Sequence, residues 1–200
     1  ITLLCLSLIA PAIGQSPQKK MKTTIHAEIN YLLFLPKDYS ETGTPSPMIV
    51  FLHGSGERGT ELEKVKAWGP PAIVEKNPDF HFIVVSPQCP EEQYWNSYLL
   101  KVMIDSILEN YHVDRNRVYL TGLSMGGFGT WELAMAYPEY FAAIAPICGG
   151  GNPNLVSQLK KIPVWAFHGK KDDAVPAYQS ARMVDALKMI DADVKYTVLP

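Results

Sequence analysis

Short apolar runs divide the chain at regular intervals, and they predict the strands of a buried sheet. Residues 48–52, Met-Ile-Val-Phe-Leu, contain no polar position. Such a run is typical of a parallel strand that is covered on both faces. The expected strands are residues 29–35, 48–52, 80–86, 117–121, 141–147, 163–167 and 194–199.

Segments with helical periodicity lie between these runs, and we expect helices at residues 99–111, 128–137 and 179–190. In the first of them, one apolar stripe is formed by Leu100, Met103, Ile104, Ile107 and Leu108. Alternating strands and helices predict an α/β fold with a mainly parallel sheet flanked by helices. Ligands bind such sheets outside the carboxyl ends of the strands.

The composition is that of one globular domain, with 200 residues, 47% hydrophobic and 19% charged. A net charge of −2 gives no electrostatic reason to expect a nucleic acid or an anionic membrane as partner. The chain has no internal repeat or low-complexity tract.

The first residues have the character of an export signal. Residues 1–13 are nearly all apolar, and Gly14 and a polar stretch follow them, so we expect a signal peptide at 1–14 that lacks its basic start. Its alternative is a buried helix. We expect a linker or first edge strand at 15–28, the main domain at 29–200, and a secreted or periplasmic protein without stable membrane insertion.

The cysteines give no sign of a metal site. Cys5 falls in the expected signal peptide, whereas Cys89 and Cys148 follow different strands and are expected to be unpaired. We expect no metal and no cofactor.

Polar or glycine-rich loops follow five of the predicted strands, at residues 53–59, 87–90, 122–127, 148–151 and 168–176. In the third, the apolar run 118–120 leads into Gly122-Leu-Ser124-Met-Gly126. A serine between glycines at a strand-to-helix corner predicts a nucleophile elbow. The alternative is a glycine-rich turn in which Ser124 only caps the next helix.

A nucleophilic serine needs an oxyanion hole, a base and an acid that orients the base. The backbone N–H groups of Ser55 and Met125 are the candidates for the oxyanion hole, and His53 is expected to brace the loop. Asp172 is the candidate acid, with Asp173 as its rival.

These five motifs, in this order, resemble a group of exported bacterial α/β-hydrolases similar to phospholipase/carboxylesterase and dienelactone-hydrolase-like enzymes, often labelled predicted peptidases. The resemblance covers nearly all of residues 29–200 and implies Ser124 as nucleophile and Asp172 as triad acid. In that order of residues the catalytic histidine follows the acid. All five histidines, however, precede Asp172: His26, His53, His81, His112 and His168. We therefore expect a hydrolase domain incomplete at its carboxyl-terminal end, with the base beyond Pro200.

The substrate is less well defined. Trp68, Tyr94 and Trp95 are candidates for an acyl or aromatic pocket, although aromatic side chains are equally common in a core. We expect a small-molecule or polymer-borne carboxylic ester as substrate. The alternatives are a serine peptidase of the prolyl-oligopeptidase type and a non-catalytic binding protein on the same fold. Glu57 and Arg58 are expected to form an ion pair that holds the loop.

Overall fold

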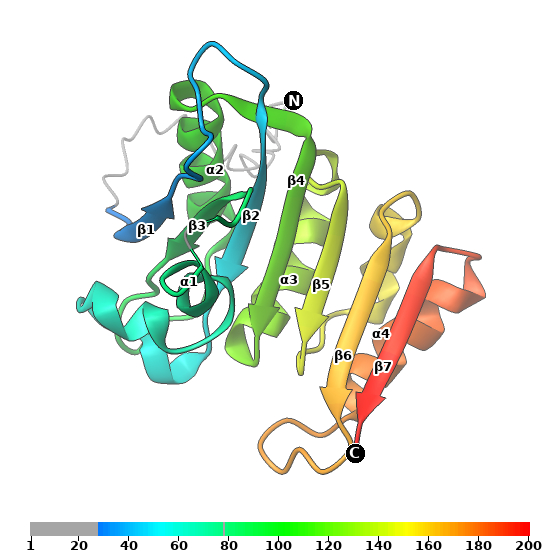
Figure 1. Ribbon diagram of the computed structural model, residues 1–200. Coiled ribbons are helices and arrows are strands. Elements are labelled where there is room, and N and C mark those ends of the chain that lie inside the picture. The colour runs from blue at the N-terminus through cyan, green and yellow to red at the C-terminus, as the bar shows by residue number, and fades with distance from the viewer. Residues whose placement is uncertain (1–27, 78) are drawn as a thin grey trace, which may run out of the picture.

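The computed structural model describes residues 28–77 and 79–200, and the expected signal peptide and most of the expected linker lie outside these ranges. A sheet in the strand order β1-β3-β2-β4-β5-β6-β7 runs through the molecule (Figure 1). Only β1 is antiparallel to its neighbour among the described strands. The mainly parallel α/β architecture is thereby confirmed.

Every predicted strand is present. The strands are β1 (Tyr31–Phe34), β2 (Ser46–Leu52), β3 (Ile83–Pro87), β4 (Val113–Leu123), β5 (Ala143–Ile147), β6 (Val164–Gly169) and β7 (Val194–Leu199). Most boundaries shift from the prediction by one or two residues, and the two largest shifts have physical reasons. Strand β3 begins later because Phe80 and Phe82 pack against each other before the ladder starts. Strand β4 begins earlier because Val113 already pairs with Ser46, across an irregular stretch of polar residues.

Three helices cover one face of the sheet: α2 (Ser97–Asn110), α3 (Met125–Ala136) and α4 (Tyr178–Met189) (Figure 1). They correspond to the three predicted helices. The short helix α1 (Gly69–Val74) lies over the opposite face, near β1, β2 and β3. It escaped prediction because Pro70 and Pro71 open it, and a helix of this length shows no periodicity.

The core lies between the sheet and the helices α2–α4. All five residues of the predicted stripe on α2 are buried, and Trp131 of α3 is fully enclosed. Short 3₁₀ turns complete the described chain, at Ser55–Glu57, Leu62–Ala67, Pro138–Tyr140 and Pro153–Leu159.

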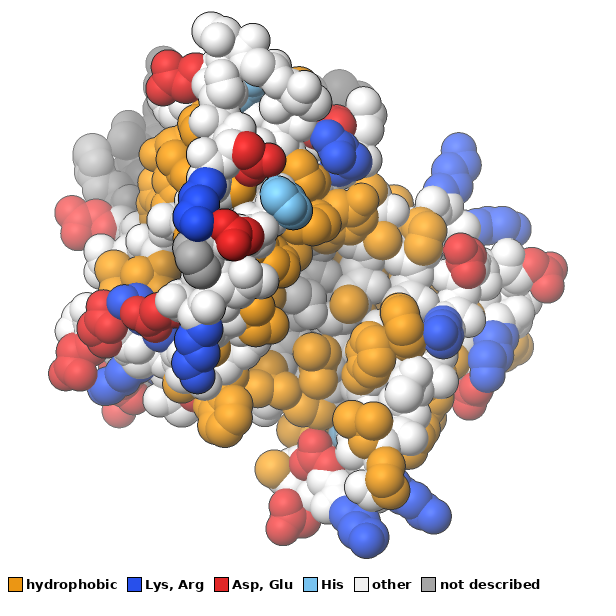
Figure 2. Space-filling model, viewed as in Figure 1, with side chains coloured by type: hydrophobic (Ala, Val, Ile, Leu, Met, Phe, Trp, Pro, Cys, Tyr) orange, Lys and Arg blue, Asp and Glu red, His pale blue; other side chains and the backbone are white. Residues whose placement is uncertain are grey.

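The other face of β4–β7 carries a groove of about 420 Å³, lined by strand residues such as Tyr119, Ala145 and Trp165. Figure 2 shows apolar side chains gathered over this hollowed face. Within the described part of the chain, no helix is both long enough and apolar enough to span a bilayer.

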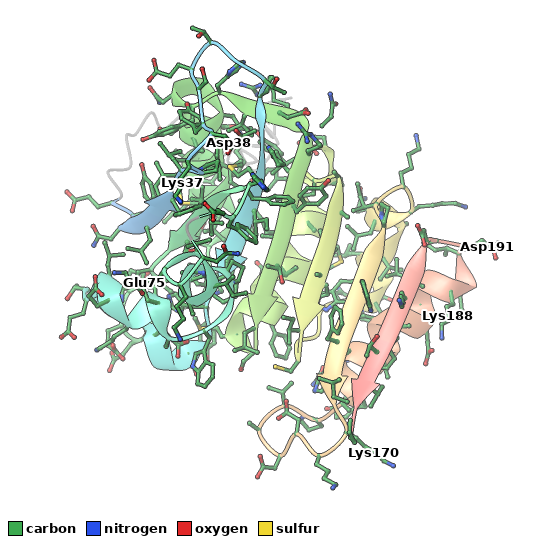
Figure 3. The ribbon with its side chains drawn as sticks, in the orientation of Figure 1. Lys37, Asp38, Glu75, Lys170, Lys188 and Asp191 are labelled. Atoms are coloured by element: carbon green, nitrogen blue, oxygen red, sulfur yellow. The ribbon has the colours of Figure 1, made fainter. Side chains whose placement is uncertain are left out.

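Opposite edges of the sheet differ in what they carry. Lys170 lies at the carboxyl ends of β6 and β7, whereas Lys188 and Asp191 lie at the amino ends (Figure 3). The loops with candidate chemistry all follow carboxyl ends, as expected for a parallel sheet.

Candidate active site

Ser124 lies at the corner between β4 and α3 with a strained backbone. Its φ of 55° and ψ of −115° fall in a region that residues with a side chain rarely adopt. Backbone bonds hold it there, because its N–H donates to the Ile147 carbonyl at 2.9 Å and its own carbonyl accepts from the Phe128 N–H at 3.0 Å. Its side chain makes no capping bond, so the helix-cap interpretation is wrong, and the backbone has the sharp strand-to-helix corner that was predicted here.

The flanking glycines let backbone pack directly on backbone. A Cβ at position 126 would lie 1.8 Å from the Leu52 carbonyl oxygen, and one at position 122 would lie 2.3 Å from the Gly126 carbonyl oxygen. Helix α3 can therefore touch the end of β2 only because these positions carry no side chain.

Gly126→Ala is expected to destabilise the fold by more than about 4 kcal/mol, because the clash is with backbone and cannot be relieved by a rotamer change. Gly56→Ala is the matched control, since a Cβ there meets no heavy atom within 4 Å, and it should change stability by less than about 0.5 kcal/mol. Urea unfolding of both variants measures the difference. Equal stabilities would contradict the close contact.

The loop after β2 lies beside the elbow. A Cβ at Gly54 would be 3.8 Å from the Ser124 Cβ. Ser55 opens a 3₁₀ turn and Met125 opens α3, so neither N–H has a partner within its own helix. Two backbone N–H groups without a partner in their own helices thus belong to residues next to Gly54 and Ser124, and such groups are the donors from which an oxyanion hole is built.

His53 braces this loop from within the core, where its side chain is 1% exposed. Its Nε2 lies 3.0 Å from the Cys89 N–H, which can only donate, so Nε2 accepts and the ring proton is on Nδ1. That Nδ1–H donates to the Gly54 carbonyl at 2.6 Å. With both ring nitrogens engaged by backbone, His53 is the predicted brace.

Burial lowers the pKa of His53, with the Gly54 hydrogen bond and the Glu57 carboxylate opposing that shift. The unfolded chain therefore binds a proton near the ordinary value of about 6.5 while the folded protein does not. The contribution of His53 to the free energy of unfolding is therefore complete above that value and is lost below it, by up to about 1.4 kcal/mol per pH unit.

We expect urea unfolding between about pH 7 and pH 5 to show that the wild type loses more stability as the pH falls, or gains less, than His53→Gln does. His81→Asn, at an exposed position, is the control and should keep the wild-type slope. An unchanged slope in His53→Gln would contradict the assignment.

Two further side chains hold the loop through its carbonyl groups. The Gln88 Nε2 donates to the carbonyls of Glu57 and Glu61, each at 2.9 Å. Arg58 donates to the carbonyls of Ser55 at 3.0 Å and Gln93 at 3.2 Å. The expected Glu57–Arg58 ion pair is wrong, because neighbouring residues of a helical turn point in different directions. Glu57 instead faces His53, with 3.9 Å between its Oε2 and Nδ1.

Asp172 is fixed within the loop after β6. Its Oδ1 accepts from the backbone N–H groups of Ala174 at 3.0 Å and Val175 at 2.8 Å. The Lys170 N–H donates to the Leu199 carbonyl at 2.7 Å, which ties this loop to the end of β7. Asp173 is exposed, so the carboxylate held by the loop is that of Asp172.

Cys148 lies between the elbow and the loop at residues 170–177, which carries the candidate acid Asp172 and is called the acid loop below. Burial raises the pKa of its thiol, contact with the Ser124 backbone lowers it, and the neighbouring Asp172 carboxylate raises it again. The thiol therefore touches both the Ser124 backbone and the Asp172 carboxylate. The residue has a positive φ of 41°. Sequence reasoning expected Cys148 and Cys89 to be unpaired, which is confirmed, but gave Cys148 no place in the site.

None of the four described histidines is placed to act as the base. His81 precedes β3 and His112 precedes β4, so both lie at the amino edge of the sheet, away from Ser124. His53 and His168 are engaged by hydrogen bonds within the core. His26 lies outside the described residues. In the same ranges, no group of three His, Cys, Asp or Glu side chains could hold a metal ion.

The three aromatic candidates occupy different environments. Trp95 is 8% exposed and packs edge-on against His53, while its Nε1–H donates to the His53 carbonyl at 3.3 Å. Tyr94 is 77% exposed beneath Arg58, and Trp68 is 60% exposed at the start of α1. The structure thus brings Ser124, Ser55, Met125 and Asp172 to one edge, with Trp95 below the loop.

A serine elbow on a mainly parallel sheet, with an acid loop two strands away, defines an α/β-hydrolase. The match to known proteins is more specific. The family model described as "Putative esterase" matches residues 22–190, and the chain belongs to this esterase family.

Several relatives share this architecture. A solved thermostable esterase is 38% identical, with a TM-score of 0.75 over 86% of this chain and 51% of that one. Poly(3-hydroxyalkanoate) depolymerase C of Paucimonas lemoignei is 32% identical over 54% of this chain and 30% of that protein. The bifunctional acetylxylan esterase/xylanase XynS20E of Neocallimastix patriciarum is 30% identical over 65% of this chain and 20% of that protein. The chain therefore spans about half of the solved esterase and less than a third of these two relatives.

Proposed function

We propose that this chain is the catalytic core of a serine hydrolase that cleaves carboxylic esters through an acyl-enzyme on Ser124. The strained conformation of Ser124 carries the proposal, because such strain persists only where the surrounding structure enforces it. The membership in an esterase family supports an ester substrate.

In the proposed mechanism, the Ser124 Oγ attacks the ester carbonyl carbon and the ester bond then breaks to release the alcohol. The N–H groups of Ser55 and Met125 donate to the oxyanion that forms. Such donors are each worth about a hundred- to a thousand-fold in kcat. Water then attacks the acyl-enzyme and releases the carboxylic acid, which restores Ser124.

The base that takes the Ser124 proton is proposed to be a histidine supplied from beyond Pro200. A chain leaving β7 at Pro200 starts beside the Asp172 loop, because the Leu199 carbonyl bonds the Lys170 N–H. A histidine there would reach the carboxylate of Asp172, which would orient the ring and stabilise its charged form.

The proposed substrates are short acyl esters, either free or borne on a polymer. Two of the similar proteins are named for polymeric substrates, a polyhydroxyalkanoate and an acetylated xylan. The face around Ser124 is formed by loops, which is where substrate range is set in this kind of sheet.

A fluorophosphonate probe and a substrate panel test the proposal on the product of the complete gene. We expect covalent labelling at Ser124 and hydrolysis of p-nitrophenyl acetate, and weaker or no cleavage of aminoacyl p-nitroanilides. Preferential cleavage of the anilides would make the protein a peptidase. Absence of labelling and of all hydrolysis would make it a non-catalytic member of the fold.

A further inference from the structure

His168 makes a set of contacts that its neutral form cannot supply. Its side chain is 1% exposed, near the end of β6. The Nε2 lies 2.7 Å from the Val175 carbonyl oxygen, and the Nδ1 lies 2.7 Å from the Ser180 Oγ. The same Oγ lies 2.7 Å from the Gly149 carbonyl oxygen.

Counting protons along this chain of contacts favours a ring that carries two N–H groups. Carbonyl oxygens only accept, so the bond to Val175 needs an Nε2–H and the bond to Gly149 needs the Ser180 hydroxyl proton. The bond between Nδ1 and Oγ then needs an Nδ1–H. A neutral imidazole carries one N–H and leaves one of these bonds unmade in the core, at a cost of about 1–3 kcal/mol.

A carboxylate is in place to balance the second proton. The Asp172 Oδ2 lies 3.6 Å from the His168 Nε2, and its Oδ1 is already fixed by the N–H groups of Ala174 and Val175. The other titratable side chains of the loop, α4 and β7 are mostly exposed, at Lys170, Lys171, Asp173, Tyr178, Arg182, Asp185, Lys188 and Lys195. The two that are partly buried are Cys148 after β5, whose thiol touches Asp172, and Tyr196 on β7, whose hydroxyl donates to the Ala177 carbonyl. Both are neutral in their protonated forms.

We propose that His168 is a buried imidazolium that positions Asp172 for catalysis. The charged ring ties Asp172 and Val175 of the acid loop to the loop after β5, through Ser180 of α4 and the Gly149 carbonyl. It acts as a positioning residue and not as the base, because both its nitrogens point at fixed partners. The catalytic part of this inference rests on the proposed function, whereas the charge state does not.

Nuclear magnetic resonance of protein labelled with ¹⁵N-histidine tests the charge state without any activity. We expect two slowly exchanging ring N–H protons on His168 at neutral pH. In Ser180→Ala, which removes the acceptor of Nδ1, only the Nε2–H bonded to Val175 should remain. Loss of both signals in His168→Gln assigns them. A single ring N–H in the wild type would overturn the charge assignment, and no variant needs to fold for that result.

A double-mutant cycle tests the positioning role in the product of the complete gene. We expect His168→Gln to lower kcat by about 10- to 100-fold with little change in KM, and to add no further loss in an Asp172→Asn background. Equal losses in both backgrounds would show that His168 does not act through Asp172. If Asp172→Asn itself keeps full activity, the proposed triad fails, while the two-proton signature still decides the charge of His168.

Discussion

Ser124→Ala is expected to lower kcat for p-nitrophenyl acetate by about 10⁵–10⁶-fold and to abolish labelling by a fluorophosphonate. The reason is that acyl transfer without the hydroxyl must proceed by direct attack of water on the bound ester. The fold should be unaffected, because the Ser124 side chain makes no capping bond and the elbow is held by its backbone. The measurement is the kcat for p-nitrophenyl acetate and the extent of fluorophosphonate labelling of the purified wild type and variant.

Ser106→Ala is a suitable control, since this serine lies on the exposed side of α2 and is remote in the fold from the carboxyl edge. It should retain wild-type activity and labelling. Esterase activity that survives in Ser124→Ala and copurifies with the variant would remove Ser124 from the mechanism.

Asp172→Asn is expected to lower kcat by about 10⁴-fold with a nearly unchanged KM, because an amide cannot hold the base in the correct tautomer or stabilise its charge. The loop should keep its shape, since the amide oxygen can still accept from the N–H groups of Ala174 and Val175, but the melting temperature should fall because the charge on His168 loses its carboxylate partner. Kinetic assays of p-nitrophenyl esters and a thermal melt measure both quantities.

Asp173→Asn is the matched control, because the same change is made one residue along the loop at an exposed side chain. It should keep activity within about threefold of the wild type, as surface substitutions usually have small effects. A large loss in Asp173→Asn with a small loss in Asp172→Asn would exchange the roles of the two carboxylates.

Much of the architecture could be predicted from the sequence because short-range patterns of apolar and polar residues determine it. Unbroken apolar runs identify buried parallel strands, and the spacing of Leu100 to Leu108 identifies the buried face of α2. The elbow was equally clear, since glycines at positions 122 and 126 around Ser124 are required by one particular backbone contact. Helix α1 left no such pattern, because it is short and has two prolines in its first turn.

The remaining parts of the site could not be predicted because they depend on contacts between distant segments. Nothing in the residues around Gln88 indicates that its amide will hold the carbonyls of Glu57 and Glu61. The position of Cys148 between Ser124 and Asp172 follows from the order of strands β4, β5 and β6 in the sheet. The predicted Glu57–Arg58 ion pair is wrong because residues adjacent in sequence need not have adjacent side chains. Here Glu57 faces His53 and Arg58 bonds the Ser55 carbonyl.

The direct packing of α3 on the end of β2 also has a consequence for how this protein can diversify. Any side chain at position 122 or 126 would displace helix α3 and Ser124 together. Substitutions of these two glycines therefore cannot accumulate without loss of the elbow. Exposed loops such as residues 90–94 after β3 carry no such restriction and can accept insertions. New substrates would therefore be acquired by changes in those loops while the elbow stays the same. The substrate range of such a protein can thus evolve independently of its reaction chemistry.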